Sequence, residues 1–456
     1  MSGGSPEGGP PLHVEADVPD SAPRIAGLDV LRGIAILAIL FMNINHMGAS
    51  NYASLFDPRQ IGWSQADQTV WWLREVIVDG TARGLLEMLF GVGMVILTDR
   101  AAAGAGERAV WRRYRTRNIV LLAFGLVHVL VLLWPGDILH TYALAALIVF
   151  WFRRLSARKL LGFGLVMAAL QLVGGGFGYH AEAGKAAAIR SAQQEQAAGR
   201  PLDKAATEAL AEAAERRREQ VAERRAHVAN VTSENAARTG DFRSWASAAW
   251  SDSWYLFSHG LEVLFVWEAA STMLIGAALY RWGVIQGARS RRFYLGLTLV
   301  SYAIGLGARA IGATGEIVAP DAPSIMWSLD EPARLLTTLG HIGLAHLLLG
   351  IAGGRRMLRP FEAAGRTALS IYIAQTLIGM WVLYPPFMLG FYGRQGWVEL
   401  MVTALAINAV LLVLANLWMR RFAIAPVEWA WRSLAEGRRL PFGRRPQPAA
   451  EAPPPT

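Results

Sequence analysis

Cysteine is missing from this chain of 456 residues. Its absence excludes disulfide bonds, thiolate metal sites, thioester intermediates on the chain and CxxC redox chemistry, so any cofactor must be held by other groups. Charged residues are scarce as well, at 17%, whereas hydrophobic residues make up 53%. This balance is not that of a soluble globular protein, and it predicts an all-α protein that crosses a membrane many times.

Several short motifs of common enzyme classes are also missing. GxSxG, a phosphate-binding GKS loop, a dinucleotide glycine fingerprint and HExxH do not occur in a usable context. His341 and His346 are five residues apart, which does not match the i,i+4 spacing of helical metal sites. We therefore expect neither an ATP-driven pump nor a metal site.

The net charge of +9 comes mainly from short loops between apolar runs. This distribution follows the positive-inside rule, so it indicates the lipid bilayer and not nucleic acid as the partner of the chain. Residues 1–23 are rich in Pro, Gly and acidic residues, and we interpret them as a disordered tail and not as a cleavable signal peptide. Residues 420–456 are expected to form a C-terminal tail.

An apolar helix needs about 20 residues to cross a bilayer, and this length predicts about ten spans. Their expected limits are 28–48, 79–98, 118–134, 137–152, 159–179, 256–280, 292–312, 333–352, 366–384 and 398–418. The connections after the second, fourth, sixth and eighth spans are rich in Arg, whereas the others are poor in basic residues or acidic. This alternation predicts that both termini are cytoplasmic.

The expected organisation is five spans within 24–180, a loop at 181–250 and five more spans within 251–419. The loop is rich in Ala, Glu, Gln and Arg, and it reads as helix without a sustained apolar stripe. We interpret it as a solvated helical hairpin over the extracytoplasmic face. The alternative is a substrate-recognition lid.

The first span carries polar residues at both of its ends. Asp29 and Arg32 are three apart near its cytoplasmic start, and Asn43 and His46 are three apart near its opposite end. Arg32 and Asn43 are eleven apart, about three helical turns, so these residues share one face. A polar stripe of this kind normally faces a cavity or another helix.

Other ionisable and polar groups lie inside the predicted spans, where they are usually paired or functional. Asp137 and His140 are three apart, as in a general base whose tautomer an Asp fixes, although capping of a helix start explains the same pattern. His128 is most simply an interhelical hydrogen-bonding residue. Further candidates are Glu262 and the deeper Glu268, which should be paired or protonated, with Ser370, Tyr372 and Gln375 as pocket or packing residues.

Five segments in order resemble the successive signatures of the YeiB-like bacterial inner-membrane family, domain of unknown function 418. They are LDVLRGIAILAILFMNI, VDGTARGLLEMLFGVGM, YRTRNIVLLAFGLVHVLVLLWPGDILHTYAL, GRTALSIYIAQTLIG and APVEWAWRSLAEGRRLPF. The resemblance implies a multi-pass protein of the bacterial inner (plasma) membrane. It also implies a distant similarity to transmembrane acyltransferases, including the heparan-glucosaminide N-acetyltransferases and the bacterial sugar O-acyltransferases.

In those sugar O-acyltransferases the acyl donor enters from the cytoplasm, and the first span carries an Arg, ten further residues and then a His that serves the acceptor hydroxyl. In this chain Arg32 and ten further residues lead to Asn43, so that His is absent from its place. His46 lies one turn further on the same face.

Our leading hypothesis is an acyltransferase-like protein that moves an acyl group, with acyl-CoA as the possible donor, to a hydroxyl of an envelope glycan or lipid. His46 or His140 would be the base, Asp137 would orient the His, and Asn43 would stabilise an oxyanion. Substrate binding would involve Asp29, Arg32, His128, Glu262, Arg366, Tyr372 and Gln375. The alternatives are a transporter or exporter of a small metabolite, for which we find no clearly paired broken helices, and a non-catalytic membrane partner.

Overall fold

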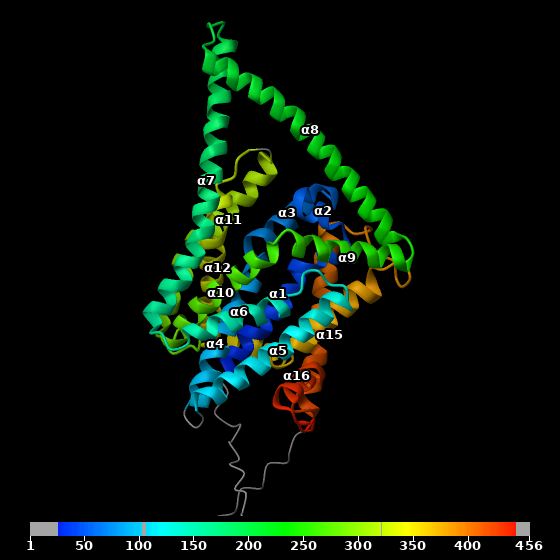
Figure 1. The fold of residues 1–456 in the computed structure, drawn as a ribbon. Coiled ribbons are helices and arrows are strands. Elements are labelled where there is room, and N and C mark those ends of the chain that lie inside the picture. Colours follow the sequence, from blue (N-terminus) through cyan, green and yellow to red (C-terminus); the bar gives the residue numbers. More distant parts are fainter. Residues whose placement is uncertain (1–25, 103–105, 321, 444–456) are drawn as a thin grey trace, which may run out of the picture.

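The computed structural model describes residues 26–102, 106–320 and 322–443, which are almost entirely helical (Figure 1). The first half contains α1 (Ala26–Gly48), α2 (Asn51–Phe56), η1 (Pro58–Gln60), α3 (Gln65–Leu73), η2 (Arg74–Val78), α4 (Thr81–Ala102), α5 (Glu107–Leu130), α6 (Leu139–Val149), η3 (Phe150–Phe152) and α7 (Ala157–Ala197). The second half contains α8 (Lys204–Thr239), α9 (Phe242–Ser258), α10 (Leu261–Arg281), α11 (Arg291–Val318), α12 (Met326–Leu349), α13 (Ala352–Arg366), α14 (Ala368–Thr376), η4 (Leu377–Leu383), α15 (Trp397–Arg421) and α16 (Pro426–Glu436).

Six helical segments within the described ranges are long and apolar enough to cross a membrane. They are α1, the run from α3 to α4 (Gln65–Asp99), α7, α10, α11 and α15. A seventh is counted if α12 and α13, which are bent by 116°, form one span. α6 with η3 and α14 with η4 are shorter apolar helices, and α5 carries four arginines between positions 112 and 117. Each predicted span coincides with a helix, but the count of ten is not confirmed.

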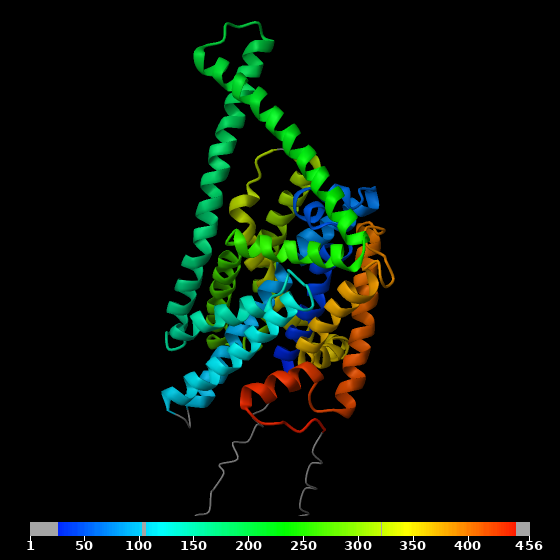
Figure 2. The same cartoon turned by 45° about the vertical axis from the view of Figure 1, so that its right-hand side comes forward.

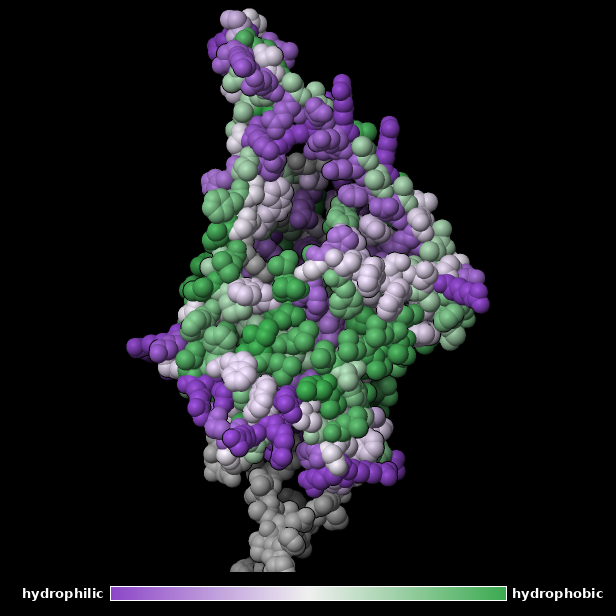
Figure 3. Space-filling view, viewed as in Figure 1, coloured by the Kyte–Doolittle hydropathy of each residue, from purple (hydrophilic) through white to green (hydrophobic). Residues whose placement is uncertain are grey.

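Apolar side chains cover the outside of this bundle. Val166 and Phe177 of α7, Ile311 of α11 and Leu405 of α15 are all exposed. Figure 3 shows a broad hydrophobic band across the middle of the face in view. Exposed apolar surface of this extent indicates contact with lipid, so the protein is a multi-pass membrane protein.

The first helix lies inside the bundle and crosses α13 closely. A Cβ atom on Gly365 would lie 1.8 Å from the carbonyl oxygen of Asp29, and one on Gly33 would lie 2.0 Å from that of Phe361. Only glycine allows two helix backbones to approach so closely. The basic segment 353–366, which we expected to be a connecting loop, is therefore a helix that supports the start of α1.

The predicted loop at 181–250 is helical. α7 and α8 form a hairpin that projects from one end of the bundle, which we call the hairpin end, and α16 lies at the opposite end (Figures 1 and 2). Ion pairs from Glu182 of α7 to Arg216 of α8 and from Lys185 of α7 to Glu212 of α8 join the two arms of the hairpin. From the base of the hairpin, α9 runs across the bundle to the start of α10.

Candidate functional site

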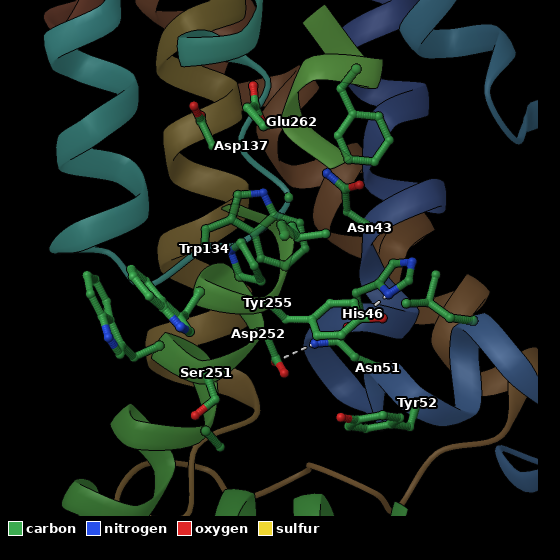
Figure 4. A pocket seen from close by; sticks show the side chains of 18 of the residues that line it. Asn43, His46, Asn51, Tyr52, Trp134, Asp137, Ser251, Asp252, Tyr255 and Glu262 are labelled. Atoms are coloured by element: carbon green, nitrogen blue, oxygen red, sulfur yellow. Dashed lines mark hydrogen bonds between the residues drawn. The ribbon is translucent and has the colours of Figure 1, made fainter. Parts of the chain in front are cut away.

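A cavity of about 1340 Å³ lies at the hairpin end of the bundle. Residues from α1, α2, α4, α6, α8, α9, α10 and the turn before α6 line it. Figure 3 shows this region as a hollow beneath the hairpin, and Figure 4 shows side chains from several helices converging on it. Because the end of α8 and most of α9 line the cavity, the 181–250 loop is more than a solvated hairpin, and its second half covers the site.

His46 lines this cavity at the end of α1, one turn beyond Asn43, which lines it too. The Nδ1 atom of His46 lies 2.9 Å from Oδ1 of Asn51, and Nδ2 of Asn51 donates to Oδ2 of Asp252 at 2.6 Å (Figure 4). Asp252 also accepts a hydrogen bond from Arg238 at 2.6 Å. These contacts form a continuous chain from α1 through α2 to α9 and α8.

This chain of hydrogen bonds fixes the tautomer of His46. An ionised Asp252 only accepts, so it draws the NH₂ group of Asn51 towards itself and turns the amide oxygen towards His46. The Nδ1 atom of His46 must then carry the proton, which leaves the lone pair on Nε2. A neutral histidine with its basic nitrogen assigned in this way is suited to remove a proton from a bound molecule.

Glu234 of α8 holds the neighbouring segment in place. Its carboxylate accepts hydrogen bonds from the hydroxyl of Ser50 and from the backbone N–H groups of Asn51 and Tyr52. Burial, together with the negative charge of Glu234, raises the pKa of Asp252 to about 6, although Arg238 opposes this shift. The covering helices therefore supply both the position and the charge on which the His46 arrangement depends.

A second cluster surrounds Asp137 in the turn before α6. Its two carboxylate oxygens accept from Nδ1 of His128 at 2.6 Å and from Nδ1 of His140 at 2.7 Å. The Nε2 atom of His140 lies 3.1 Å from Glu262, off the line of a hydrogen bond, and Glu262 also accepts from Thr141 at 2.8 Å. Asp137 and Glu262 line the cavity, whereas the two histidines are buried behind them. The predicted proximity of Asp137 and His140 is thus confirmed.

Several predicted substrate-binding residues instead join helices. His128 also contacts Thr376 at 2.8 Å, and Tyr372 holds the 136–138 turn through Gly136 and Ile138. Gln375 donates to the carbonyl group of Ile36 and to Asn408, and none of these three residues lines the cavity. Arg366 donates to the carbonyl group of Ala423. These contacts agree with the packing interpretation.

The polar stripe on α1 is divided in two. Asp29 and Arg32 form the expected ion pair at 3.0 Å, near the end of the bundle opposite the hairpin. Asn43 and His46 line the cavity, which extends along α1 as far as Ile39. Between them, Ala35 and Ile36 are buried in the core. The cavity in this structure therefore does not extend to Arg32.

Below the cavity lies a buried network of charges from α4, α10 and α12. Arg334 contacts Glu331, Glu87 and Glu268, and Arg83 donates to Glu268 at 2.7 Å. The expectation that Glu268 is paired is confirmed. Arg83 and Glu87 also line the cavity, so the network forms part of its floor.

Sequence reasoning missed Asn51, Asp252 and Arg238. Asn51 and Asp252 are 201 positions apart, and none of the three belongs to a recognisable spacing pattern. For Asp252 the available signal was its place in the Trp-rich stretch SWASAAWSDSWY (244–255), directly before the predicted span at 256–280. Among the residues that the structure describes, no group of three or more His, Asp or Glu side chains is arranged to hold a metal ion.

Sequence comparison identifies known proteins that are similar to this chain over most of its length. A family model described as "Protein of unknown function (DUF418)" matches residues 279–438. The uncharacterized protein YxaH of Bacillus subtilis (strain 168) is 28% identical over 426 residues, which cover 90% of this chain and 94% of YxaH. The uncharacterized protein YeiB of Escherichia coli (strain K12) is 28% identical over 449 residues, which cover 90% of this chain and 96% of YeiB.

No solved structure matches the chain. The matched family segment begins at the end of α10 and runs through α16, whereas the similarity to YxaH and YeiB extends over both halves of the bundle. The chain is therefore similar to YxaH and YeiB over 90% of its length, and residues 279–438 match the DUF418 family model.

Proposed function

We propose that this protein transfers an acyl group to a hydroxyl of an envelope glycan or lipid headgroup bound in the cavity, with His46 as the general base. The observation that carries the proposal is the hydrogen-bond chain from Asp252 through Asn51 to His46, which assigns the lone pair to Nε2. The aromatic residues Trp134, Trp254 and Tyr255 line the same cavity and supply flat surfaces of the kind that sugar rings pack against.

In this reaction the acceptor O–H gives its proton to Nε2 of His46 while the oxygen attacks the carbonyl carbon of an acyl thioester. The new C–O bond replaces the C–S bond, and the thiol leaves with a proton. The side chain of Asn43, which lines the cavity one turn from His46, would donate to the oxyanion of the tetrahedral intermediate. Asp137 and Glu262 would contact the acceptor, with His140 as a second candidate base behind them.

Acyl-CoA is the proposed donor, and it would bind from the cytoplasm. Arg32 is partly exposed at the start of α1 and would bind donor phosphates. The acyl chain would then pass Ile36 and Ile39 to the cavity floor, which requires these two residues to move. Under this proposal the hairpin end is extracytoplasmic, both termini are cytoplasmic, all ten helical segments cross the inner membrane, and residues 181–250 cover the site.

Transport of a small metabolite is the second candidate. The buried network of Arg83, Glu87, Glu268 and Arg334 favours it, because charged clusters inside a membrane often mark an ion or substrate path. A carrier of this kind would move its substrate across the membrane without changing it covalently.

The two functions are separated by reconstituting the purified protein in proteoliposomes with labelled acyl-CoA and envelope extracts. Acyl transfer predicts label that becomes covalently attached to a glycan or lipid, as detected by mass spectrometry. Transport predicts movement of an unmodified solute. Transfer without dependence on His46, or no transfer with any donor chain length, contradicts the proposed function.

A further inference from the structure

The cavity has an aromatic edge that faces away from the bundle. α9 buries Trp245, Ala249 and Ser253 at a spacing of four residues. On another face, Trp250, Trp254 and Phe257 are 45%, 62% and 38% exposed. A water-exposed helix does not normally present large aromatic side chains in this way.

The position of α9 explains this face. α9 is joined to the membrane span α10 by a turn at His259 and Gly260, whose φ of +70° is easily adopted by glycine. α9 runs across the bundle and not along it (Figures 1 and 2). In Figure 3 a pale row of residues lies at this height, between the hydrophobic band and the hydrophilic hairpin. Trp and Tyr prefer this boundary, and amphipathic helices lie in its plane.

Trp250 and Trp254 belong to the cavity lining as well as to the exposed face. The cavity is therefore bordered by residues at the depth of lipid headgroups. Its lining is apolar at Ile39, Met42 and Phe265 and polar around His46 and Asp252. This division matches a lipid that places its headgroup at the polar part and the start of its chains against the apolar part.

The charge of the lining restricts the headgroup further. Asp79, Glu87, Asp137, Glu234, Asp252 and Glu262 contribute carboxylates, whereas Arg83 is the arginine among the lining residues. An anionic headgroup would meet several like charges in this cavity. An uncharged sugar would meet hydrogen-bond acceptors and aromatic surfaces instead.

We infer that the acceptor is a glycolipid with an uncharged sugar headgroup, which enters the cavity sideways from the membrane past Trp250 and Trp254 of α9. The inference rests on the proposed function in one respect, because it calls the bound lipid an acceptor. The binding itself does not require catalysis. A water-soluble glycan would instead enter through the hollow beneath the hairpin. The two routes give different results in a binding experiment.

The depth of α9 is measured first. Because the chain has no cysteine, a single Trp254→Cys substitution carries a nitroxide label without background, and Glu215→Cys on the exposed part of α8 is the matched control. Electron paramagnetic resonance in proteoliposomes compares collisions with oxygen and with a water-soluble nickel complex. We expect interfacial depth for the label at 254 and bulk water for the label at 215. A label at 254 that is as accessible to nickel as the one at 215 overturns the inference.

Binding is measured with a diglucosyl diacylglycerol that carries a photoreactive diazirine on its sugar. We expect it to label cavity peptides of α1, α2 or α9, and the unlabelled glycolipid to compete at least tenfold more effectively than the free disaccharide or phosphatidylglycerol. Equal competition by the free disaccharide, or preferential competition by phosphatidylglycerol, overturns the inference. Labelling of the wild-type protein without any acyl transfer to the glycolipid would refute the proposed function alone, because the inference concerns binding and not catalysis.

Discussion

The amide oxygen of Asn51 lies 2.9 Å from Nδ1 of His46, and the NH₂ group of the same side chain donates to Asp252. The protonation state of Asp252 on α9 therefore affects the base, His46, on α1. Asn51 can act as donor on one side and acceptor on the other only in one orientation. Asp252 selects that orientation while it is ionised. A residue of α9 thereby determines which ring nitrogen of His46 is basic.

Acyl transfer should therefore fall as the pH drops through about 6. Burial raises the pKa of Asp252 to about 6, so below that pH its carboxyl is protonated and can donate to Asn51. The amide can then reverse, which moves the His46 proton to Nε2 and removes the base. Asn at position 252 accepts from Asn51 but does not titrate in this range.

The measurement is a pH–rate profile of the wild type and of Asp252→Asn. We expect the acidic limb near pH 6 to move to lower pH in the variant, with the plateau retained within about tenfold. Asp252→Ala, which has no acceptor, should lower the plateau at every pH. An unchanged acidic limb in Asp252→Asn would show that Asp252 does not control His46.

Removal of Arg334 should destabilise the bundle severely. Its guanidinium contacts Glu331, Glu87 and Glu268 in the buried network, and a buried ion cluster that loses one member typically costs about 3–5 kcal/mol. Thermal unfolding in detergent should show a large fall in Tm for Arg334→Ala. The control is Arg216→Ala in the partly exposed α7–α8 pair, where little change is expected. Equal Tm values for the two variants would contradict the role of the network.

Gly365→Ala should separate α1 from α13. The added Cβ would lie 1.8 Å from the backbone oxygen of Asp29, and a backbone atom cannot rotate away. The matched control is Gly353→Ala in the same helix, where a Cβ meets nothing within 4 Å and helix propensity favours Ala by about 0.5–1 kcal/mol. Tm should fall in the first variant and stay level or rise in the second. A Tm that falls for Gly353→Ala but not for Gly365→Ala would contradict the close crossing of α1 and α13.

Glu428, which belongs to α16, should stabilise the start of α14. Its carboxylate accepts hydrogen bonds from the backbone N–H groups of Leu369 and Ser370 and from the hydroxyl of Ser370. Glu428→Ala leaves these donors unsatisfied, and we expect a loss of about 1–2 kcal/mol, seen as a lower Tm. The exposed Glu436 of the same helix provides the control as Glu436→Ala. A loss that is no larger for position 428 than for 436 would contradict this capping.

Sequence patterns predicted the local features of this fold well. Apolar runs located the helices. The i,i+3 spacing paired Asp29 with Arg32 on one helix face and Asp137 with His140 across the start of α6, because both contacts depend only on local geometry. The contacts of His46 depend on how distant helices pack. Arg238 lies in the 181–250 segment, whose composition indicated only a solvated helix, and Asp252 lies between that segment and the predicted span at 256–280. Their approach to the cavity therefore required the three-dimensional structure.

The bent connection between α12 and α13 was missed for a related reason. Arg355, Arg356 and Arg359 marked the segment as a basic loop, yet Gly354, Leu358 and Gly365 are buried. A short amphipathic helix carries its charges on one face and its small or apolar residues on the other, which a count of loop charges does not detect.

The central claim is that Nε2 of His46 removes a proton from the acceptor in the cavity. The most direct measurement is the rate at which purified protein in proteoliposomes transfers a labelled acyl group from acyl-CoA to glycolipid, compared between the wild type and His46→Ala. His180→Ala, in the exposed hairpin, is the control. We predict that His46→Ala lowers the rate by about 100-fold or more, the usual contribution of a general base, while the control keeps wild-type activity. A rate for His46→Ala equal to that of the wild type would contradict the account.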